Sequence, residues 1–229
     1  MAKAIRYALP VVGLLMLASG AYLGLVWVPA ERDMGDVARI MYVHVPAVWM
    51  MLLASLLNFG ASLWYLFRAS WKVDALAEAG AEISLLFGVI GVLLGAIWAK
   101  PTWGVYWNWD PRLTSVTIML VTYAGYMALR RFVEDPERRA RWSAVAGVFL
   151  AANSVLVWYS VKWFNSLHQT QSSPKTTYPE LVLTLRWNSF AFLFIAIWFI
   201  WLRYDLAMQT RRSEVAPPEP PPAAAGSPA

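Results

Sequence analysis

The sequence predicts an all-α integral membrane protein with six transmembrane helices, cytoplasmic termini and an outer Trp-rich segment between the third and fourth helices. Of the 229 residues, 59% are hydrophobic and 14% are charged, whereas soluble domains carry roughly a quarter charged residues. A soluble domain of this length could not cover its surface with so few charges. The charges also fall in short clusters between long apolar stretches, which is the pattern of connected membrane spans.

The scarce residue types exclude several kinds of chemistry. The chain has no Cys, so it cannot form disulfides, zinc fingers, iron–sulfur clusters or thiol nucleophiles. Two His are too few to build a tetrahedral metal cage without Cys. The net charge of +5 is not gathered on a soluble face, so nucleic acid is not an expected partner.

Six apolar segments approach or reach the length of about 20 residues that crosses the hydrocarbon core. Because backbone groups cannot stay unpaired in lipid, each segment is interpreted as a helix. The third segment is short, and its start is left open between residue 83 and the earlier Glu78 or Glu82. The six segments are 8–28, 46–67, 83–98, 113–129, 143–161 and 187–202.

The first segment has a second interpretation, because Lys3 and Arg6 precede it as they would precede a secretory signal peptide. Its apolar run continues to Val28, which is long for a signal peptide and favours a retained span. Within the third segment, Gly91 and Gly95 have the GxxxG spacing of closely packed helices. That spacing is too common in membrane spans to indicate a function.

Lys and Arg are distributed unequally between the two sides of the membrane. The side with the chain termini and the second and fourth connections carries twelve, and the other side carries seven. Because short cytoplasmic connections are enriched in Lys and Arg, both termini are predicted to be cytoplasmic. Residues 1–205 are predicted to form the transmembrane domain. Residues 206–229, which are rich in Pro and Ala, are predicted to form a disordered cytoplasmic tail.

The outer connections hold both His residues and an unusual run of aromatic residues. His44 lies just before the second predicted span, in MYVHVP, and His168 follows the fifth, in NSLHQ. Between the third and fourth spans lies the run WGVYWNWD. Whether this run is helical or extended, Trp103 and Trp107 share a face. Such a run presents a flat apolar surface that suits a large planar ligand at the membrane surface.

The residues that follow this run have two interpretations. Asp110 and Pro111 are typical of a helix N-cap followed by Pro at the first helical position. Arg112 then lies in the first turn, either as an interfacial side chain or as a clamp on an anionic group of the ligand.

A planar ligand flanked by two His suggests haem, because neutral imidazole is a common axial ligand of haem iron. The simpler interpretation of each His alone is an interfacial residue bonded to a carbonyl or a lipid headgroup. The Trp-rich run gives the haem interpretation its weight, since a porphyrin has an apolar face for Trp and propionates for Arg or Lys.

The run WGVYWNWDPRLTS resembles the signature WGxxWxWD of the haem-handling (WWD-motif) membrane protein family of cytochrome c maturation. Six spans, the short length, MYVHVP and NSLHQ are similar to the haem exporter protein C (CcmC) branch, over the whole chain except the Pro-rich tail. The resemblance implies that His44 and His168 are axial ligands of haem iron. It also implies that the signature residues hold haem at the outer surface; these are Trp103, Gly104, Trp107, Trp109 and Asp110.

The resemblance further implies a role and partners. Members bind haem b (iron protoporphyrin IX) as cargo at the outer, periplasmic face of the bacterial inner membrane and present it to a membrane-anchored periplasmic haem chaperone. They work beside ABC transporter subunits and a small single-span membrane protein. This chain has no phosphate-binding loop, so ATP hydrolysis would belong to a partner, and no catalytic side chains are evident. The candidate propionate contacts are Arg112, Lys100, Lys162 and Arg186.

Two other functions stay open. A membrane subunit of a quinone-linked respiratory oxidoreductase would also hold haem, but such subunits bury paired His within their spans, and neither His lies inside a predicted span. A solute transporter with an aromatic gate would carry ionisable residues at mid-membrane, and the central parts of the six segments have none. Haem binding and delivery is therefore the main prediction, and enzymatic activity is not expected.

Overall fold

A computed structural model describes residues 2–168 and 178–215, and helices form the regular structure of this part. A π-helical turn, η1 (Leu23–Trp27), extends the first helix, and a 3-10 helix, η2 (Asp36–Ile40), leads into the second. The α-helices are α1 (Ala2–Tyr22), α2 (Met41–Phe67), α3 (Trp71–Trp103), α4 (Pro111–Phe132), α5 (Pro136–Trp163) and α6 (Pro179–Val215). The predicted all-α class is confirmed for the described residues.

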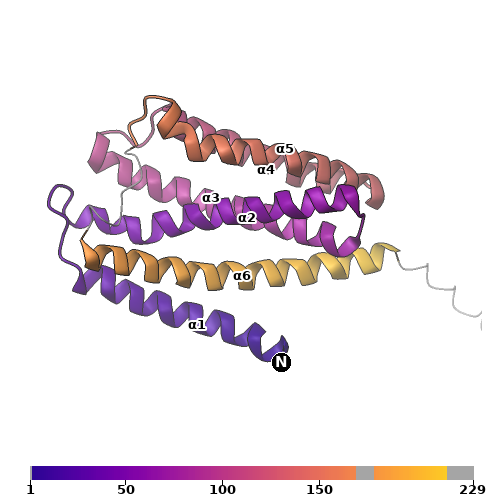
Figure 1. The fold of residues 1–229 in the computed structure, drawn as a ribbon, viewed down its shortest axis with the longest axis horizontal. Coiled ribbons are helices and arrows are strands. Elements are labelled where there is room, and N and C mark those ends of the chain that lie inside the picture. Colours follow the sequence, from indigo (N-terminus) through magenta and orange to yellow (C-terminus); the bar gives the residue numbers. More distant parts are fainter. Residues whose placement is uncertain (1, 169–177, 216–229) are drawn as a thin grey trace, which may run out of the picture.

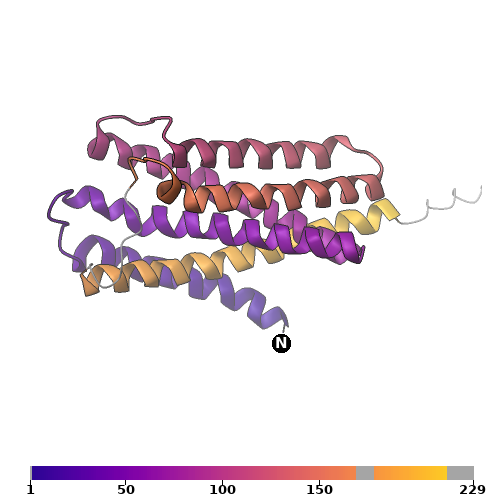
Figure 2. The same cartoon turned by 45° about the horizontal axis from the view of Figure 1, so that its top comes forward.

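The helices run up and down in a bundle of three layers (Figure 1). α2 and α3 form the central pair, α4 and α5 cover one side, and α1 and α6 cover the other. Figure 2 shows the same pairing after rotation. The connections that leave α1, α3 and α5 lie together at one end of the bundle. We call it the histidine end, because His44 and His168 both lie there.

Five helical segments are long and apolar enough to cross a membrane: Ile5–Trp27, Asp36–Phe67, Trp71–Trp103, Pro136–Trp163 and Pro179–Glu214. α4 has 22 residues but is not among them, because hydroxyl side chains and terminal Arg lower its hydropathy. Two of these hydroxyls, on Thr117 and Thr122, donate to the carbonyls one turn earlier at 2.9 and 2.8 Å. α4 thus satisfies much of its own side-chain polarity internally.

Capping residues fix the ends of the helices that flank the Trp-rich run. Asp110 is the N-cap of α4, as predicted, and its Oδ1 accepts from the Leu113 N–H at 2.9 Å. The same pattern starts α5, where Asp135 accepts from the Arg138 N–H at 2.7 Å, and Pro follows each cap. α3 ends because Gly104 adopts a left-handed conformation (φ 79°), which Gly tolerates without strain.

Each of the six α-helices extends beyond its predicted span at one end or both, and three of these extensions change a prediction. α2 begins at Met41, so His44 lies in its first turn, and the prediction that neither His lies inside a spanning segment is wrong for His44. α3 begins at Trp71 rather than near residue 83. α6 ends at Val215, past the predicted start of the tail at 206, and residues 216–229 lie outside the described part. The charged residues near these ends of α3 and α6 did not stop the helices, because they are paired across the bundle.

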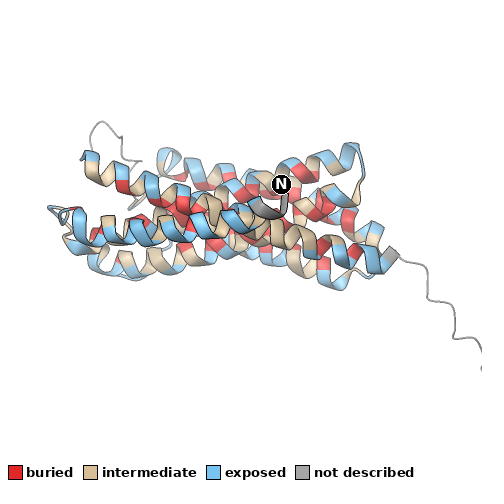
Figure 3. Cartoon of the chain, turned by 90° about the horizontal axis from the view of Figure 1, so that it is seen from below, coloured by how far each residue is buried: buried red, intermediate tan, exposed pale blue. Residues whose placement is uncertain are grey.

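Buried positions run along the inside of the bundle (Figure 3), and small residues among them bring the central helices together. A Cβ on Gly80 of α3 would lie 2.9 Å from the Asn58 backbone nitrogen and 3.0 Å from the Ala54 oxygen of α2. The Asn58 side chain donates to the Ala77 carbonyl of α3 at 2.8 Å. Close backbone approach with an interhelical hydrogen bond is the usual way in which membrane helices adhere.

Four charges, three of them buried and Glu78 partly buried, join α3, α4 and α6 at the end opposite the histidines; we call them the ion-pair cluster. Asp74 accepts from Arg130 at 2.9 and 3.1 Å and from the Arg211 Nε at 2.8 Å. Glu78 accepts from the same two Arg at 3.1 and 2.7 Å. Asp74, Arg130 and Arg211 are 3%, 7% and 4% exposed, so two carboxylates and two guanidiniums balance one another away from solvent.

Candidate functional site

His44 projects from the first turn of α2 against α3. Its Nδ1 lies 3.0 Å from the Gly91 carbonyl oxygen. A carbonyl can only accept, so Nδ1 carries the proton and the Nε2 lone pair is free. The Trp98 ring meets the imidazole edge-on, with 5.7 Å between centroids. One nitrogen is therefore committed to the protein and the other is chemically able to bind a metal.

His168 lies in the connection after α5, beside the end of α3. Its ring meets Trp103 edge-on, with 4.8 Å between centroids. Its backbone N–H donates to the Ser166 hydroxyl at 3.1 Å. The Nδ1 atom is 3.6 Å from Asp110 Oδ2, which is longer than a hydrogen bond but places a carboxylate opposite this nitrogen.

Asp110 fastens the His168 connection to the start of α4. Besides capping the helix, its Oδ2 accepts from the Ser166 hydroxyl and from the Leu167 N–H at 3.0 Å. Burial alone would raise the pKa of Asp110, but these bonds outweigh it and hold the pKa below its usual value. The carboxylate is ionised at neutral pH, so Asp110 is both a cap and a fixed negative charge beside His168.

Burial lowers the pKa of His168, the charge of Arg112 lowers it further, and Asp110 opposes both. His168 is therefore neutral at pH 7, which is the form that binds metals. His44 and His168 pack against Trp98 and Trp103, which lie five residues apart at the end of α3. Arg112 follows Asp110, the residue that faces His168. The fold thus gathers both predicted His and Arg112 at one place.

Unpaired donors accompany the two imidazoles. Among the described residues, Arg112 Nε and Trp98 Nε1 are buried with no hydrogen-bond partner. Buried donors are nearly always paired, and leaving one unpaired costs about 1–3 kcal/mol. These atoms favour a ligand that carries acceptors.

The Trp-rich run is irregular after Gly104, so the helical interpretation of the run is wrong. Gly104 ends α3, and the cap at Asp110 starts α4 only six residues later. Trp103, the last residue of α3, contacts His168. Trp107 and Trp109 instead form an edge-to-face pair with 5.5 Å between centroids, and Trp109 is 69% exposed.

The basic residues predicted to contact propionates differ in their environments. Lys100 donates to the Gly104 carbonyl at 2.9 Å. Lys162 lies over an aromatic ring, 5.3 Å from its centroid, and Arg186 is exposed on α6. Arg112 is the member of this group that has a buried donor without a partner among the described residues.

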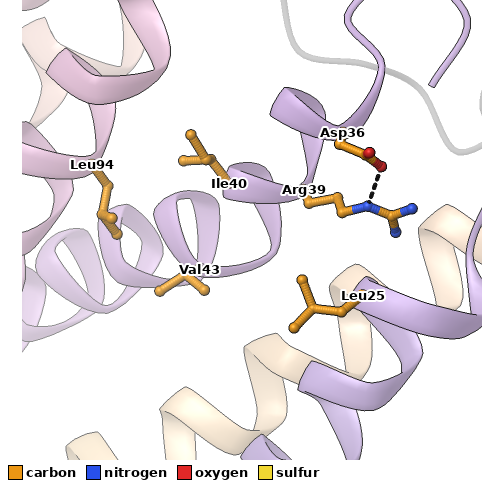
Figure 4. A pocket seen from close by; sticks show the side chains of 6 residues that line it. All are labelled: Leu25, Asp36, Arg39, Ile40, Val43 and Leu94. Atoms are coloured by element: carbon orange, nitrogen blue, oxygen red, sulfur yellow. Dashed lines mark hydrogen bonds and ion pairs between the residues drawn. The ribbon is translucent and has the colours of Figure 1, made fainter. Parts of the chain in front are cut away.

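A separate groove of about 670 Å³ opens beside the start of α2 (Figure 4). The Arg39 guanidinium at its rim donates to Asp36 at 2.8 Å and to the Val28 carbonyl at 3.0 Å. Because Arg39 is committed to these acceptors, the groove offers apolar surface rather than an anion site. Its lining consists of Leu25, Asp36, Arg39, Ile40, Val43 and Leu94.

Comparison with known proteins agrees with the Trp-rich signature: the family described as Heme exporter protein C matches residues 1–217. The chain belongs to this family. It is 34% identical over 208 residues to Heme exporter protein C of Bradyrhizobium diazoefficiens, covering 87% of this chain and 78% of the relative. The Heme exporter protein C of Escherichia coli K12 is 32% identical over 216 residues, covering 91% and 86%.

A relative outside the bacteria extends the family. It is the putative cytochrome c biosynthesis ccmC-like mitochondrial protein of Marchantia polymorpha, 34% identical over 172 residues that cover 73% of this chain and 72% of the relative. The family resemblance predicted from the sequence is confirmed.

Sequence reasoning missed two participants in the site, Ser166 and the backbone of Gly91. Ser166 stands two residues before His168, where a hydroxyl can reach a nearby backbone N–H, so a local signal existed. The carbonyl of Gly91 carried no such signal, because any residue has one. The only hint was the GxxxG spacing with Gly95.

Proposed function

We propose that this chain binds haem at the histidine end, with His44 and His168 as axial ligands of the iron, and delivers it for c-type cytochrome maturation. One observation carries the proposal: the only two His of the chain both pack edge-on against Trp rings at the same end of α3, His44 on Trp98 and His168 on Trp103. Both Nδ1 atoms face oxygens, at 3.0 and 3.6 Å. Ligands oriented in this way present Nε2 to a metal.

The residues around the histidines fit haem. Bound haem would supply an iron with two open axial positions and two propionates. The unpaired Arg112 Nε suits a propionate. Further candidate propionate contacts are the basic side chains in or near the outer connections: Lys100, Lys162 and Arg186. A Cβ on Gly104 would meet nothing within 4 Å, so the backbone there leaves space beside Trp103. Trp107, Trp109 and Asp110 complete the proposed platform.

Haem b held by two imidazoles suits storage and transfer rather than catalysis. Two axial His fill both positions on the iron, so oxygen is kept away from it. The proposal therefore includes no enzymatic step, and ATP hydrolysis belongs to partner ABC transporter subunits. The exposed Trp109 gives a periplasmic, membrane-anchored haem chaperone a surface to approach, and a small single-span protein would complete the assembly.

We further propose that α4 is a sixth span and that the histidine end faces the periplasm of a bacterial inner membrane. A helix of 22 residues is about 33 Å long, which matches a hydrocarbon core of about 30 Å. The Arg-rich ends of α4 and α5 lie at the opposite end, together with the end of α6. That distribution favours cytoplasmic termini, with the transmembrane domain extending to residue 215.

The respiratory-subunit alternative is less well supported. Although His44 lies inside α2, it occupies the first turn, and His168 lies in a connection. Both are at the end of the bundle rather than at mid-depth, where electron transfer to a membrane quinone would need them.

The experiment is to purify the protein from haem-replete cells and compare its absorption and resonance Raman spectra with those of His44→Ala and His168→Ala. We expect a six-coordinate low-spin haem in the wild type and a five-coordinate high-spin species in each variant. Tyr7→Ala, which alters an exposed residue of α1, is the matched control. Wild-type spectra in both His variants would overturn the axial assignment.

Delivery needs its own measurement. A tagged periplasmic domain of the haem chaperone should be captured by haem-loaded protein and acquire haem from it. Capture by the loaded wild type but not by His44→Ala is the expected result. Equal capture by both would separate chaperone binding from haem ligation and contradict the delivery proposal.

A further inference from the structure

We propose that Gly91 and Gly95 of α3 form a recess that sets the tautomer and orientation of His44, which makes Gly95 a positioning residue for iron ligation. This inference rests on the proposed function. It assigns a site-specific role to a GxxxG pair that otherwise indicates only helix packing.

The recess consists of a carbonyl and the space beside it. The Gly91 oxygen accepts from His44 Nδ1 at 3.0 Å. A carbonyl has two lone pairs, so this oxygen can accept from the imidazole while it keeps its helical partner. A Cβ on Gly95 would lie 3.0 Å from His44 Cε1 and 3.5 Å from Nδ1. The imidazole therefore occupies the volume that a side chain at position 95 would need.

Helix geometry explains why position 95 matters for a carbonyl at position 91. Side chains on an α-helix lean toward its N-terminus and cover the preceding turn. A side chain at 95 would thus lie over the carbonyl at 91 and block the imidazole from reaching it. Gly95 leaves that carbonyl open on the side that faces α2. Gly91 also lets α2 come close, since a Cβ there would be 3.0 Å from Val48 Cγ2.

The recess has a chemical consequence for the ligand. As long as Nδ1–H is bonded to Gly91, Nε2 keeps its lone pair. Trp98 meets the ring edge-on from the next turn of α3 and limits its rotation. A ring displaced from the carbonyl would populate both tautomers, and the fraction with a free Nε2 would fall. Position 95 thereby acts on the iron through His44, without touching the haem itself.

The first test uses the full-length, haem-free protein labelled with 15N-histidine, at a pH where both rings are neutral. The chain has two His, so a His168→Ala spectrum assigns both rings. We expect wild-type His44 to show separate 15N shifts for a protonated Nδ1 and an unprotonated Nε2. In Gly95→Ala, and more in Gly95→Val, the two shifts should move toward each other.

The second test follows haem-loaded protein. The low-spin fraction should fall from wild type to Gly95→Ala to Gly95→Val, ending near the value of His44→Ala. Gly60→Ala and Gly60→Val are the matched controls on α2, because a Cβ at Gly60 meets nothing within 4 Å, and they should match the wild type. Far-ultraviolet circular dichroism verifies helix content, and the milder Ala variant keeps the test usable where the Val variant unfolds.

The outcomes separate this inference from the proposed function. Gly95 variants that fold and keep both the Nδ1–H tautomer and the wild-type haem spectrum would overturn the recess. A low-spin spectrum that persists in His44→Ala would overturn His44 ligation, while the 15N shifts would still decide whether Gly95 positions the ring.

Discussion

The two ends of the bundle differ in how their buried charged groups are paired. At the ion-pair end, Asp74 and Glu78 are matched by Arg130 and Arg211, with several bonds between them. At the histidine end, donors on Trp98 and Arg112 are buried without partners among the described residues. The ion-pair end also holds an unpaired donor, the Arg130 Nε. The ends differ in their charges: those of the ion-pair cluster are matched by opposite charges, whereas Arg112 has no ion-paired carboxylate among the described residues.

This difference separates a structural site from a binding site. A buried cluster whose charges neutralise one another has no charge left to attract a ligand, and removing one member leaves another charge without its partner. A cluster with unpaired donors gains when acceptors arrive. The contrast predicts that substitutions at the ion-pair end change stability, whereas those at the histidine end change haem binding.

The largest expected effect is at the ion-pair end. Asp74→Ala leaves two buried guanidiniums facing Glu78 alone, and removing one partner of a buried pair costs about 3–5 kcal/mol. The free energy of unfolding, measured in mixed micelles, should fall by this amount. The protein that remains folded should keep the wild-type haem spectrum. A changed spectrum with unchanged stability would reverse the comparison.

Arg112→Ala should weaken haem binding by about 10- to 100-fold, because a hydrogen bond to a charged group contributes about 1.5–3 kcal/mol. Stability of the haem-free protein should change little, since the Arg112 Nε has no partner to lose. Titration with haem dimethyl ester, which lacks ionised propionates, is the sharp control. The same loss of affinity for haem and for the ester would show that Arg112 does not bind a propionate.

Asp110→Asn should lower haem affinity by about tenfold, the lower end of the range for groups that orient a metal ligand, because Nδ1 of His168 is 3.6 Å away. Asn caps helices about as well as Asp, but it loses the second oxygen that accepts from the Ser166 hydroxyl and the Leu167 N–H. Stability should therefore fall by about 1–3 kcal/mol. Asp110→Ala removes the cap as well, so the difference between the two variants isolates the cap, and Asp110→Asn by itself reports the loss of the carboxylate. An unaltered haem affinity in Asp110→Asn would show that Asp110 caps α4 but does not orient His168.

The smallest effect is expected for the ion pair between α1 and α6. Arg6 and Asp205 are 2.6 Å apart, but their side chains are 37% and 29% exposed. Solvent screening limits such pairs to about 0–1 kcal/mol. Asp205→Ala is thus the matched control for Asp74→Ala in the same unfolding assay. Equal losses in the two variants would remove the distinction between buried and exposed pairs.

The sequence predicted the helical class and six long helices because a long apolar segment in lipid must pair its backbone polar groups within itself, which a helix does. It misplaced the ends of α3 and α6 for one shared reason. Asp74 and Arg211 each argue for a span ending, and only their pairing across the bundle removes the cost of burying them. Such pairing between residues far apart in the sequence is invisible to a local pattern.

The candidate site was predictable in its parts and not in its arrangement. The Trp-rich signature and its neighbours pointed to His44, His168 and Arg112, which the fold gathers. The sequence could not decide the conformation of the Trp-rich run, because Gly104 ends α3 only through its left-handed backbone. The role of the Gly91 carbonyl could not be predicted from the sequence, since a backbone acceptor becomes specific only when a neighbouring helix places a donor beside it.

The distance along the chain between partners in the ion-pair cluster has a consequence for biosynthesis. Arg211 follows Asp74 by 137 residues, so at roughly 5–20 residues per second the ribosome makes it on the order of ten seconds later. Until then the acidic start of α3 has only Arg130 as a partner. A chain cut at residue 205 would remain permanently in this nascent state. The end of α6 is thus the last component of the assembly rather than a removable tail.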